Sequence, residues 1–237
     1  MRIFILKELE KIEIAIRAQM VYTLSHYRGA FWFTDPTLFS DTAEHATCLN
    51  KLTGEFKKSD EDFIQAFKKN YSDPLPPSWM MLEIASFGSL SMIYKNLKPG
   101  KSKREISHHF GLDDSTLTSW LHSFVYIRNV CAHHSRLWNR GMSIKPQVPL
   151  NPLNTWLQDT SIKNNRTYFI LSMMLYLLQS IDVKHQFIYR FRTLLKKYPN
   201  IDVTAMGFPS DWHKEPLWSY KPTIKQHVRL MLIFKVK

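Results

Sequence analysis

The sequence is poor in the residues that make tight turns, covalent cross-links and metal sites. Among its 237 residues it has only 7 glycines and 2 cysteines. Because glycine adopts the backbone angles of tight turns most readily, the small number of glycines argues against a fold rich in such turns. The two cysteines, Cys48 and Cys131, match no zinc-binding spacing, so we expect free thiols, no structural metal and no cofactor.

The chain also lacks a hydrophobic run that would carry it into or across a membrane. Its longest apolar stretch, residues 168–178, is shorter than the about 20 residues that a membrane-spanning helix needs. Charged side chains interrupt the apolar run at the start, where a secretory signal would have to lie: Lys7, Glu8 and Glu10. We therefore expect a cytoplasmic protein that does not associate with membranes.

Acidic residues are too few to balance the basic ones. The chain has 20 aspartates and glutamates against 32 lysines and arginines, which gives a net charge of +12. Such an excess attracts phosphate backbones and anionic membranes. An ordinary basic enzyme is the alternative explanation, but on charge alone we favour a nucleic-acid partner.

Hydrophobic periodicity predicts an all-α fold. In residues 3–27, apolar residues recur at spacings of three and four, as on one face of a helix: Ile5, Leu9, Ile12, Ile16, Met20 and Leu24. Capping residues and prolines predict the bounds of further helices: 41–52, 59 or 60 to about 67, 79–94, 103–110, 113 or 114 to about 138, 167–180 and 184–198. We find no convincing pair of strands and no internal repeat.

We expect one helical domain over residues 1–200 and a mostly irregular tail over 201–237, where prolines recur. The Pro-rich linker at 73–77 is too short to mark a domain boundary. No N-cap residue precedes the first helix, which indicates either missing upstream sequence or an abrupt start.

Reactive side chains are densest at the end of the predicted helix 113–138: Arg128, Asn129, His133, His134, Arg136 and Arg140. At about 100° per residue, Asn129 and His133 are about 40° apart, and Arg136 and Arg140 fall within about 20° of Asn129. Arg128 lies to one side, about 140° from His133. One stripe of the helix is therefore predicted to carry an amide, an imidazole and two guanidinium groups.

These groups suit cleavage of RNA through its own 2′-hydroxyl. A histidine can exchange protons near neutral pH, and an arginine can clamp a phosphate and stabilise the charge on its oxygens. This chemistry requires no metal, and the sequence agrees with that, since neither an acidic pair nor a His/Cys quartet accompanies the cluster. A basic, solvated helix end is the alternative interpretation, because the helix dipole favours arginines near a C-terminus.

The run from Arg128 to His133, with Asn129 second, resembles the Arg-x(4 to 6)-His signature of the HEPN ribonuclease superfamily, in which the residue after arginine is commonly polar. Residues 79–89, 128–140 and 206–212, in that order, are similar to the Abi-like family of phage-resistance proteins. Members of that family usually carry an additional segment before the first helix.

The resemblance implies a HEPN-like helical bundle with additional helices, whose copies form a homodimer with two Arg/His motifs in one cleft. By motif matching, Arg128, Asn129 and His133 take the catalytic positions, and Arg128 could serve the partner's site. His134 also matches a family position, so either histidine could be the acid–base. Arg136 and Arg140 are candidates for catalysis or RNA binding. An antitoxin protein and a small RNA are the candidate inhibitors, between which the sequence does not decide.

Glu83 is the acid within the apolar stretch 79–94. It could orient Arg128 through an ion pair. An exposed residue on a helix face, or a simple ion pair without a role in catalysis, is the slightly favoured alternative.

A different function is suggested by residues 103–124, which resemble a helix-turn-helix with Gly111 at its turn. The positions expected to be exposed at the start of the second helix carry no basic residue: Asp113, Asp114, Ser115, Thr116 and Thr118. Because acidic side chains repel phosphates, an ordinary corner of a helical bundle is favoured there.

Three functions therefore compete. The first is a metal-independent RNA endonuclease that acts as a toxin in abortive-infection antiviral defence. The second is a HEPN-like module that binds RNA without cutting it, and the third is a helix-turn-helix DNA-binding regulator.

Overall fold

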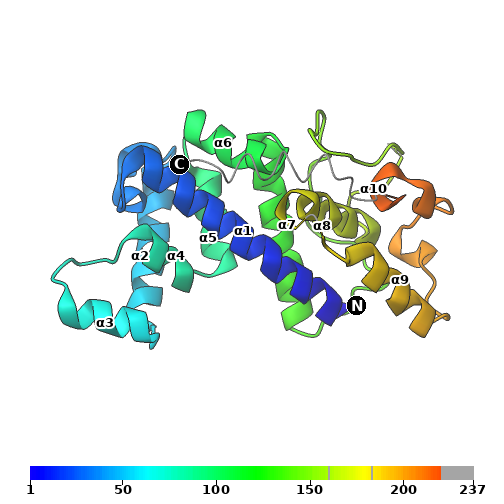
Figure 1. Ribbon diagram of the computed structural model, residues 1–237, viewed down its shortest axis with the longest axis horizontal. Coiled ribbons are helices and arrows are strands. Elements are labelled where there is room, and N and C mark those ends of the chain that lie inside the picture. The colour runs from blue at the N-terminus through cyan, green and yellow to red at the C-terminus, as the bar shows by residue number, and fades with distance from the viewer. Residues whose placement is uncertain (160, 183, 220–237) are drawn as a thin grey trace. The chain divides into compact units, whose positions relative to one another are not determined.

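The computed structural model describes residues 1–159, 161–182 and 184–219, and over this part of the chain it is all-α, as predicted. The coiled ribbons of Figure 1 are joined by loops and short 3-10 turns. The chain divides into two compact units. Unit 1 comprises Met1–Ile12 and the chain from Phe110 onward, and unit 2 comprises Glu13–His109. The expected single domain over 1–200 stays a prediction.

The first helix, α1 (Arg2–Arg28), confirms the predicted helix over 3–27. The residues that set its periodicity are all at most 2% exposed: Ile5, Leu9, Ile12, Ile16, Met20 and Leu24. The boundary between the two units falls within this helix, after Ile12.

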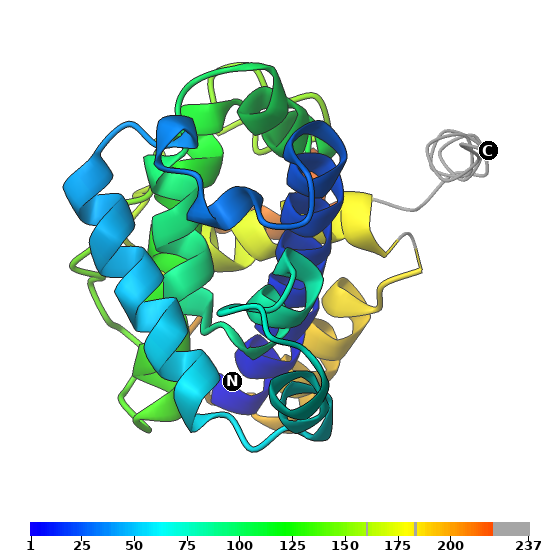
Figure 2. The ribbon, with the colours of Figure 1, turned by 90° about the vertical axis from the view of Figure 1, so that its left-hand side faces the viewer.

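Unit 2 continues with five more α-helices: α2 (Thr42–Lys58), α3 (Asp62–Asn70), α4 (Ser78–Ile84), α5 (Phe87–Asn96) and α6 (Lys101–His109). Helix α2 packs against α4 and α5, and Figure 2 shows α2 and α5 side by side. Asp41 caps α2 as predicted, and its backbone N–H donates to the side chain of Asn96 on α5 (2.9 Å). Helix α2 extends past the predicted end at residue 52 because its apolar face continues to the buried Phe56.

The prediction of one helix over 79–94 was wrong, because the chain breaks between α4 and α5. Ala85 and Ser86 are both extended, with ψ angles of 136° and 154°. The Ser86 hydroxyl caps α5 by accepting a hydrogen bond from the Ser89 N–H (3.2 Å), and Arg17 donates to the Ala85 carbonyl (3.3 Å). A serine that can cap a new helix competes with continuation of the old one.

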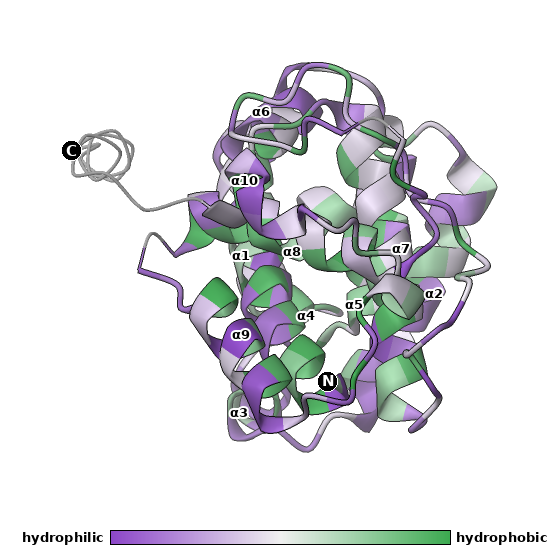
Figure 3. Ribbon diagram, turned by 90° about the vertical axis from the view of Figure 1, so that its right-hand side faces the viewer, coloured by the Kyte–Doolittle hydropathy of each residue, from purple (hydrophilic) through white to green (hydrophobic). Residues whose placement is uncertain are grey.

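In unit 1 the longer helices after α1 are α7 (Asp114–Ala132), α8 (Thr167–Ile181) and α9 (Phe187–Lys197). Every residue of α8 from Thr167 to Gln179 is buried. By contrast, α9 carries both hydrophobic and hydrophilic residues, as the colours of Figure 3 show. Within the described residues, no helix combines the length and the apolarity needed to cross a membrane.

The described part of the predicted tail, residues 201–219, consists of short helical turns joined by irregular chain and ends in α10 (Pro216–Ser219). It packs closely against α8 and α9, because Phe208 stacks on Phe191 and Trp218 stacks on Tyr168. Residues 220–237 lie outside the described residues.

A tightly enclosed turn precedes α7. Gly111 has a φ of +72°, and a Cβ atom placed there would lie 2.7 Å from the Asn154 amide nitrogen and 2.8 Å from the Tyr176 hydroxyl oxygen. The Tyr176 hydroxyl and the Leu153 N–H both donate to the Gly111 carbonyl, at 2.7 and 2.9 Å. The turn therefore requires glycine on both conformational and steric grounds.

We predict that Gly111→Ala lowers the free energy of unfolding by about 2 kcal/mol or more, because it combines a left-handed backbone with two close contacts. Gly54→Ala is the matched control. Gly54 lies within α2 with no atom within 4 Å of an added Cβ, so alanine there raises stability by about 0.5–1 kcal/mol. Urea unfolding of both variants measures this, and an equal effect of the two substitutions would contradict the geometry of the turn.

Candidate functional site at the end of helix α7

Helix α7 presents the first group of candidate residues on its exposed side. The Asp113 carboxylate caps its start by accepting a hydrogen bond from the Thr116 N–H (2.9 Å). The side chains that anchor it in the core are fully or almost fully buried: Leu117, Trp120, Leu121, Phe124, Ile127 and Cys131. In its last turn, Arg128 and Asn129 are exposed, and His133 follows as the exposed C-cap residue.

The helix ends at Ala132, not near residue 138 as predicted. The Ser135 N–H donates to the Val130 carbonyl (2.9 Å), and the His134 N–H donates to the Cys131 carbonyl (3.2 Å). This pair of bonds is a Schellman motif, which needs a left-handed residue directly after the C-cap. His134 takes that place with a φ of +56°, a conformation that costs a non-glycine residue about 1–2 kcal/mol.

Because α7 ends early, the predicted helical stripe of Asn129, His133, Arg136 and Arg140 was wrong in its second half. Asn129 and His133 remain neighbours one helical turn apart, since the His133 N–H donates to the Asn129 carbonyl (2.9 Å). Arg136 and Arg140 lie beyond the helix and do not continue its face. The prediction failed because it assumed helical geometry beyond a residue that reverses the backbone.

The loop nevertheless returns Arg140 to α7. Its Nη2 donates to the hydroxyl of Tyr126 (3.2 Å), and its guanidinium carbon lies 6.0 Å from the centre of the Tyr126 ring. On the helical wheel, Tyr126 lies within about 60° of both Asn129 and His133. Through its bond to Tyr126, Arg140 is therefore placed on the side of α7 that carries Asn129 and His133. Its Nη1 donates to the Arg136 carbonyl (3.4 Å).

Tyr126 was not among the candidate residues. Partial burial acts to raise its pKa, but hydrogen bonds with Ser143 and Arg140 outweigh burial and leave the pKa below its ordinary value. A helical wheel centred on His133 could have found Tyr126, which lies seven residues earlier on the same face. Nothing local in the sequence predicts its contact with Arg140.

Arg2 is a second residue that sequence reasoning missed. Its Nη1 donates to the His134 carbonyl (2.8 Å), so the first turn of α1 supports the left-handed residue that ends α7. The two residues are 132 positions apart, and no pattern in the sequence links them.

The loop after His134 is anchored to the rest of unit 1. Leu137 is 4% exposed, and its carbonyl accepts from the Thr167 hydroxyl (3.2 Å). The side chain of Asn139 accepts from Arg166 (2.9 Å), and the indole N–H of Trp138 donates to the Asp202 carbonyl (3.1 Å). These bonds hold the backbone that carries Arg136 and Arg140.

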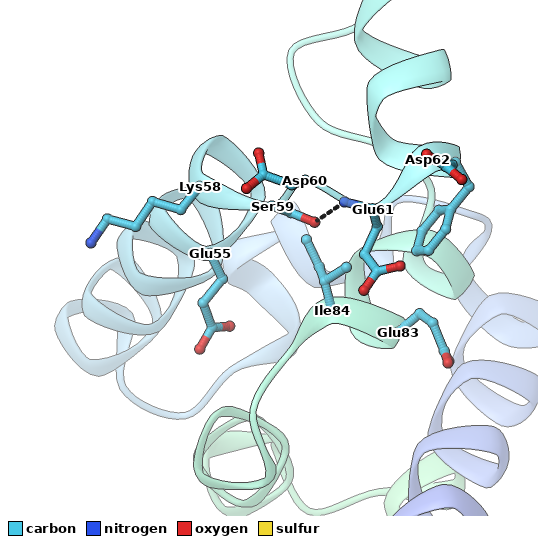
Figure 4. Close-up of a pocket in the computed structure, with 9 residues that line it drawn as sticks. Glu55, Lys58, Ser59, Asp60, Glu61, Asp62, Glu83 and Ile84 are labelled. Atoms are coloured by element: carbon cyan, nitrogen blue, oxygen red, sulfur yellow. Dashed lines mark hydrogen bonds between the residues drawn. The ribbon is translucent and has the colours of Figure 1, made fainter.

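Glu83 lies in unit 2, exposed on α4. It lines a cavity of about 780 Å³ together with further acidic residues, whose side chains Figure 4 shows: Glu55, Asp60, Glu61 and Asp62. Glu83 and Arg128 belong to different units, so a pairing between them, the less favoured of the two interpretations, stays a hypothesis.

The helix-turn-helix alternative loses one of its expected contact residues. Thr116 is fully buried, and its hydroxyl donates to the Asp113 carboxylate (2.6 Å), whereas we expected it to be exposed. This bond fixes Thr116 as part of the cap of α7. Together with the turn at Gly111, which residues 153, 154 and 176 enclose, it favours a packed corner over a surface that reads DNA.

The buried thiol of Cys131, two residues before His133, does not add a nucleophile. Burial raises the pKa of the Cys131 thiol to about 11, despite the nearby charge of Arg2, so the thiol is protonated at neutral pH. Among the described residues, no group of three or more His, Cys, Asp or Glu side chains is arranged to hold a metal ion.

Comparison with known proteins confirms the predicted family. The model of the Abi-like protein family matches residues 1–139, which is more than half of the 237 residues. The matched region contains α1 to α7 and the motif from Arg128 to His133, whereas the segment 206–212 lies beyond it. No curated protein and no solved structure matches the chain significantly. The chain therefore belongs to the family of Abi-like proteins.

Proposed function

We propose that the protein is a metal-independent RNA endonuclease that acts in the cytoplasm in abortive-infection defence. Membership of the Abi-like family supports the role in abortive infection. The observation that carries the nuclease proposal is the end of α7, where Arg128, Asn129 and His133 are all exposed.

In the proposed reaction, a histidine accepts the proton of the RNA 2′-hydroxyl, and the 2′-oxygen attacks the adjacent phosphorus. The bond from phosphorus to the 5′-oxygen of the next nucleotide breaks, and a second acid returns a proton to that oxygen. Arginine side chains stabilise the negative charge on the non-bridging oxygens. The products are a 2′,3′-cyclic phosphate and a 5′-hydroxyl.

His133 is the better candidate for the proton transfer. It is exposed and follows Asn129 by one helical turn, and its backbone is in an ordinary conformation, with φ −84°. His134 has a separate structural task, since its left-handed backbone ends the helix. Arg140 and Arg128 are the candidates for binding the phosphate, with Tyr126 orienting Arg140.

A homodimer would bring Arg128 of one copy to the site that contains His133 of the other. Arg128 and His133 are about 140° apart on α7, too far around the helix for both to face one phosphate with ease. Two copies arranged with their motifs facing each other would place Arg128 of one beside His133 of the other. The partners that this function requires are RNA, a second copy of the chain, and an antitoxin protein or small RNA that restrains it.

We predict that the protein cuts mixed-sequence RNA in the presence of a chelator and leaves 2′,3′-cyclic ends, and that His133→Ala reduces the rate by 10²-fold or more. Circular dichroism of the variant controls for folding. Because His133 is exposed, alanine should leave the fold intact. Cleavage by the variant at the wild-type rate would contradict the assignment, and saturable binding of RNA that stays intact would identify a binding module instead.

The shared site predicts complementation between two inactive variants. When Arg128→Ala and His133→Ala chains are co-expressed, about half of the dimers are mixed, and each contains one site with both native residues. We expect about a quarter of the wild-type activity from the mixture and almost none from either variant alone. A mixture as inactive as its components would show that each site uses Arg128 and His133 of one chain.

We also predict that His134→Gly raises the free energy of unfolding by about 1 kcal/mol, because glycine adopts the left-handed conformation without steric cost. If His133 is the acid–base, this variant cuts RNA at close to the wild-type rate. Denaturant unfolding and the cleavage assay are measured on the same preparation. Increased stability with loss of cleavage would assign the proton transfer to the His134 imidazole.

A further inference from the structure

A second cavity in unit 2 is bordered by positive charge. It has a volume of about 360 Å³ and lies where the end of α1, the turn after α5 and the start of α6 meet. Arg28, Lys98 and Lys101 line it, and among its lining residues there is no aspartate or glutamate. The cavity therefore carries three positive charges with no lining carboxylate to balance them.

A comparison with the acidic cavity around Glu83 shows that the positive charge belongs to the smaller cavity and not to unit 2 as a whole. Five carboxylates and one lysine, Lys58, line the cavity of Figure 4. The charge of the chain as a whole, +12, thus does not give every cavity of this unit a basic lining. The three cations of the smaller cavity come from two segments far apart in sequence, residues 24–28 and 97–102.

Two acidic residues near these cations, Asp35 and Glu105, do not line the cavity. Asp35 has a pKa lowered chiefly by its bonds to Thr37, with a smaller contribution from the charge of Arg28. Glu105 accepts a hydrogen bond from the Tyr27 hydroxyl (2.8 Å). Among the described residues, neither Arg28 nor Lys98 nor Lys101 forms a salt bridge within 4.0 Å. The three charges are thus available to a ligand.

The backbone around the cavity is held in place without a ligand. The Lys98 N–H donates to the Leu38 carbonyl (2.9 Å), beside the bridge between Phe39 and Leu97. The buried ammonium of Lys103 donates to the Lys95 and Leu97 carbonyls, both at 2.9 Å. Because the cavity is already formed, the protein loses little conformational entropy when a ligand binds there.

The rest of the lining suits a flat organic group. Leu38 is partly exposed and gives the cavity an apolar wall, whereas Leu24 and Leu97, at 1% and 3% exposed, contribute little accessible surface. The ring of Tyr27 also lines it, with the Lys101 ammonium 5.1 Å from the ring centre. Apolar and aromatic walls with a few convergent charges are typical of small-molecule sites, whose volumes run from about 300 to 1,000 Å³.

We propose that this cavity binds the phosphate of a nucleotide, with Arg28, Lys98 and Lys101 around the phosphate and the base against Tyr27 and Leu38. The nucleotide is either a free mononucleotide or the 5′-terminal nucleotide of an RNA, because both present the same phosphate monoester. The site lies wholly within unit 2 and does not depend on the proposed nuclease activity.

The test measures binding of four probes to the full chain by isothermal titration calorimetry: adenosine 5′-monophosphate, adenosine, and a short 2′-O-methylated oligonucleotide with and without a 5′-phosphate. The 2′-O-methyl groups prevent cleavage through the 2′-hydroxyl, so the result is independent of nuclease activity. Lys98→Ala/Lys101→Ala removes two of the three cations. Lys57→Ala/Lys58→Ala removes the same charge at exposed positions near the acidic cavity and is the matched control.

We expect at least one phosphorylated probe to bind at least tenfold more tightly than its unphosphorylated counterpart. The Lys98/Lys101 variant should lose that preference, and the Lys57/Lys58 variant should retain it. Preference for the mononucleotide indicates a free nucleotide, and preference for the phosphorylated oligonucleotide alone indicates an RNA 5′ end. Equal binding with and without phosphate, or equal loss in both double variants, would overturn the proposal.

Discussion

The left-handed conformation of His134 is the constraint on which the geometry of the candidate site depends. A residue with φ +56° closes the Schellman motif, stops α7 at Ala132 and turns the chain away from the helix axis. If the helix continued, Arg136 and Arg140 would follow Asn129 along one face. Because it stops, Arg140 approaches that face from a separate loop and meets Tyr126 there.

Such a turn is costly for histidine, so other parts of unit 1 must hold it. Arg2 binds the His134 carbonyl, and Leu137, Trp138 and Asn139 fix the loop that follows. The helix itself cannot shift easily, because its inner face is buried from Leu117 to Cys131. Strained backbone held by its surroundings often marks a functional site, where side chains must keep fixed positions.

The sequence predicted long, regular elements well and their interruptions poorly. The first helix was predicted almost to the residue, because an unbroken apolar period runs from Ile5 to Leu24. The break at Ala85 and Ser86 was missed because apolar residues lie on both of its sides and neither of the two residues is a glycine or a proline. The end of α7 was missed for a related reason, since histidine occupies a position where glycine is the usual signal. The contacts of Arg2 and Arg140 depend on tertiary structure, which no local pattern encodes.

The most direct measurement of the central claim is a crystal structure of the protein with a dinucleotide that lacks the attacking 2′-hydroxyl. The account predicts that the phosphate between the two nucleosides lies within hydrogen-bond distance of the Arg128 or Arg140 guanidinium group. It also predicts that the His133 ring lies beside the 2′ carbon of the first sugar. A phosphate bound away from the end of α7, with His133 facing solvent, would contradict the assignment of this helix end as the catalytic site.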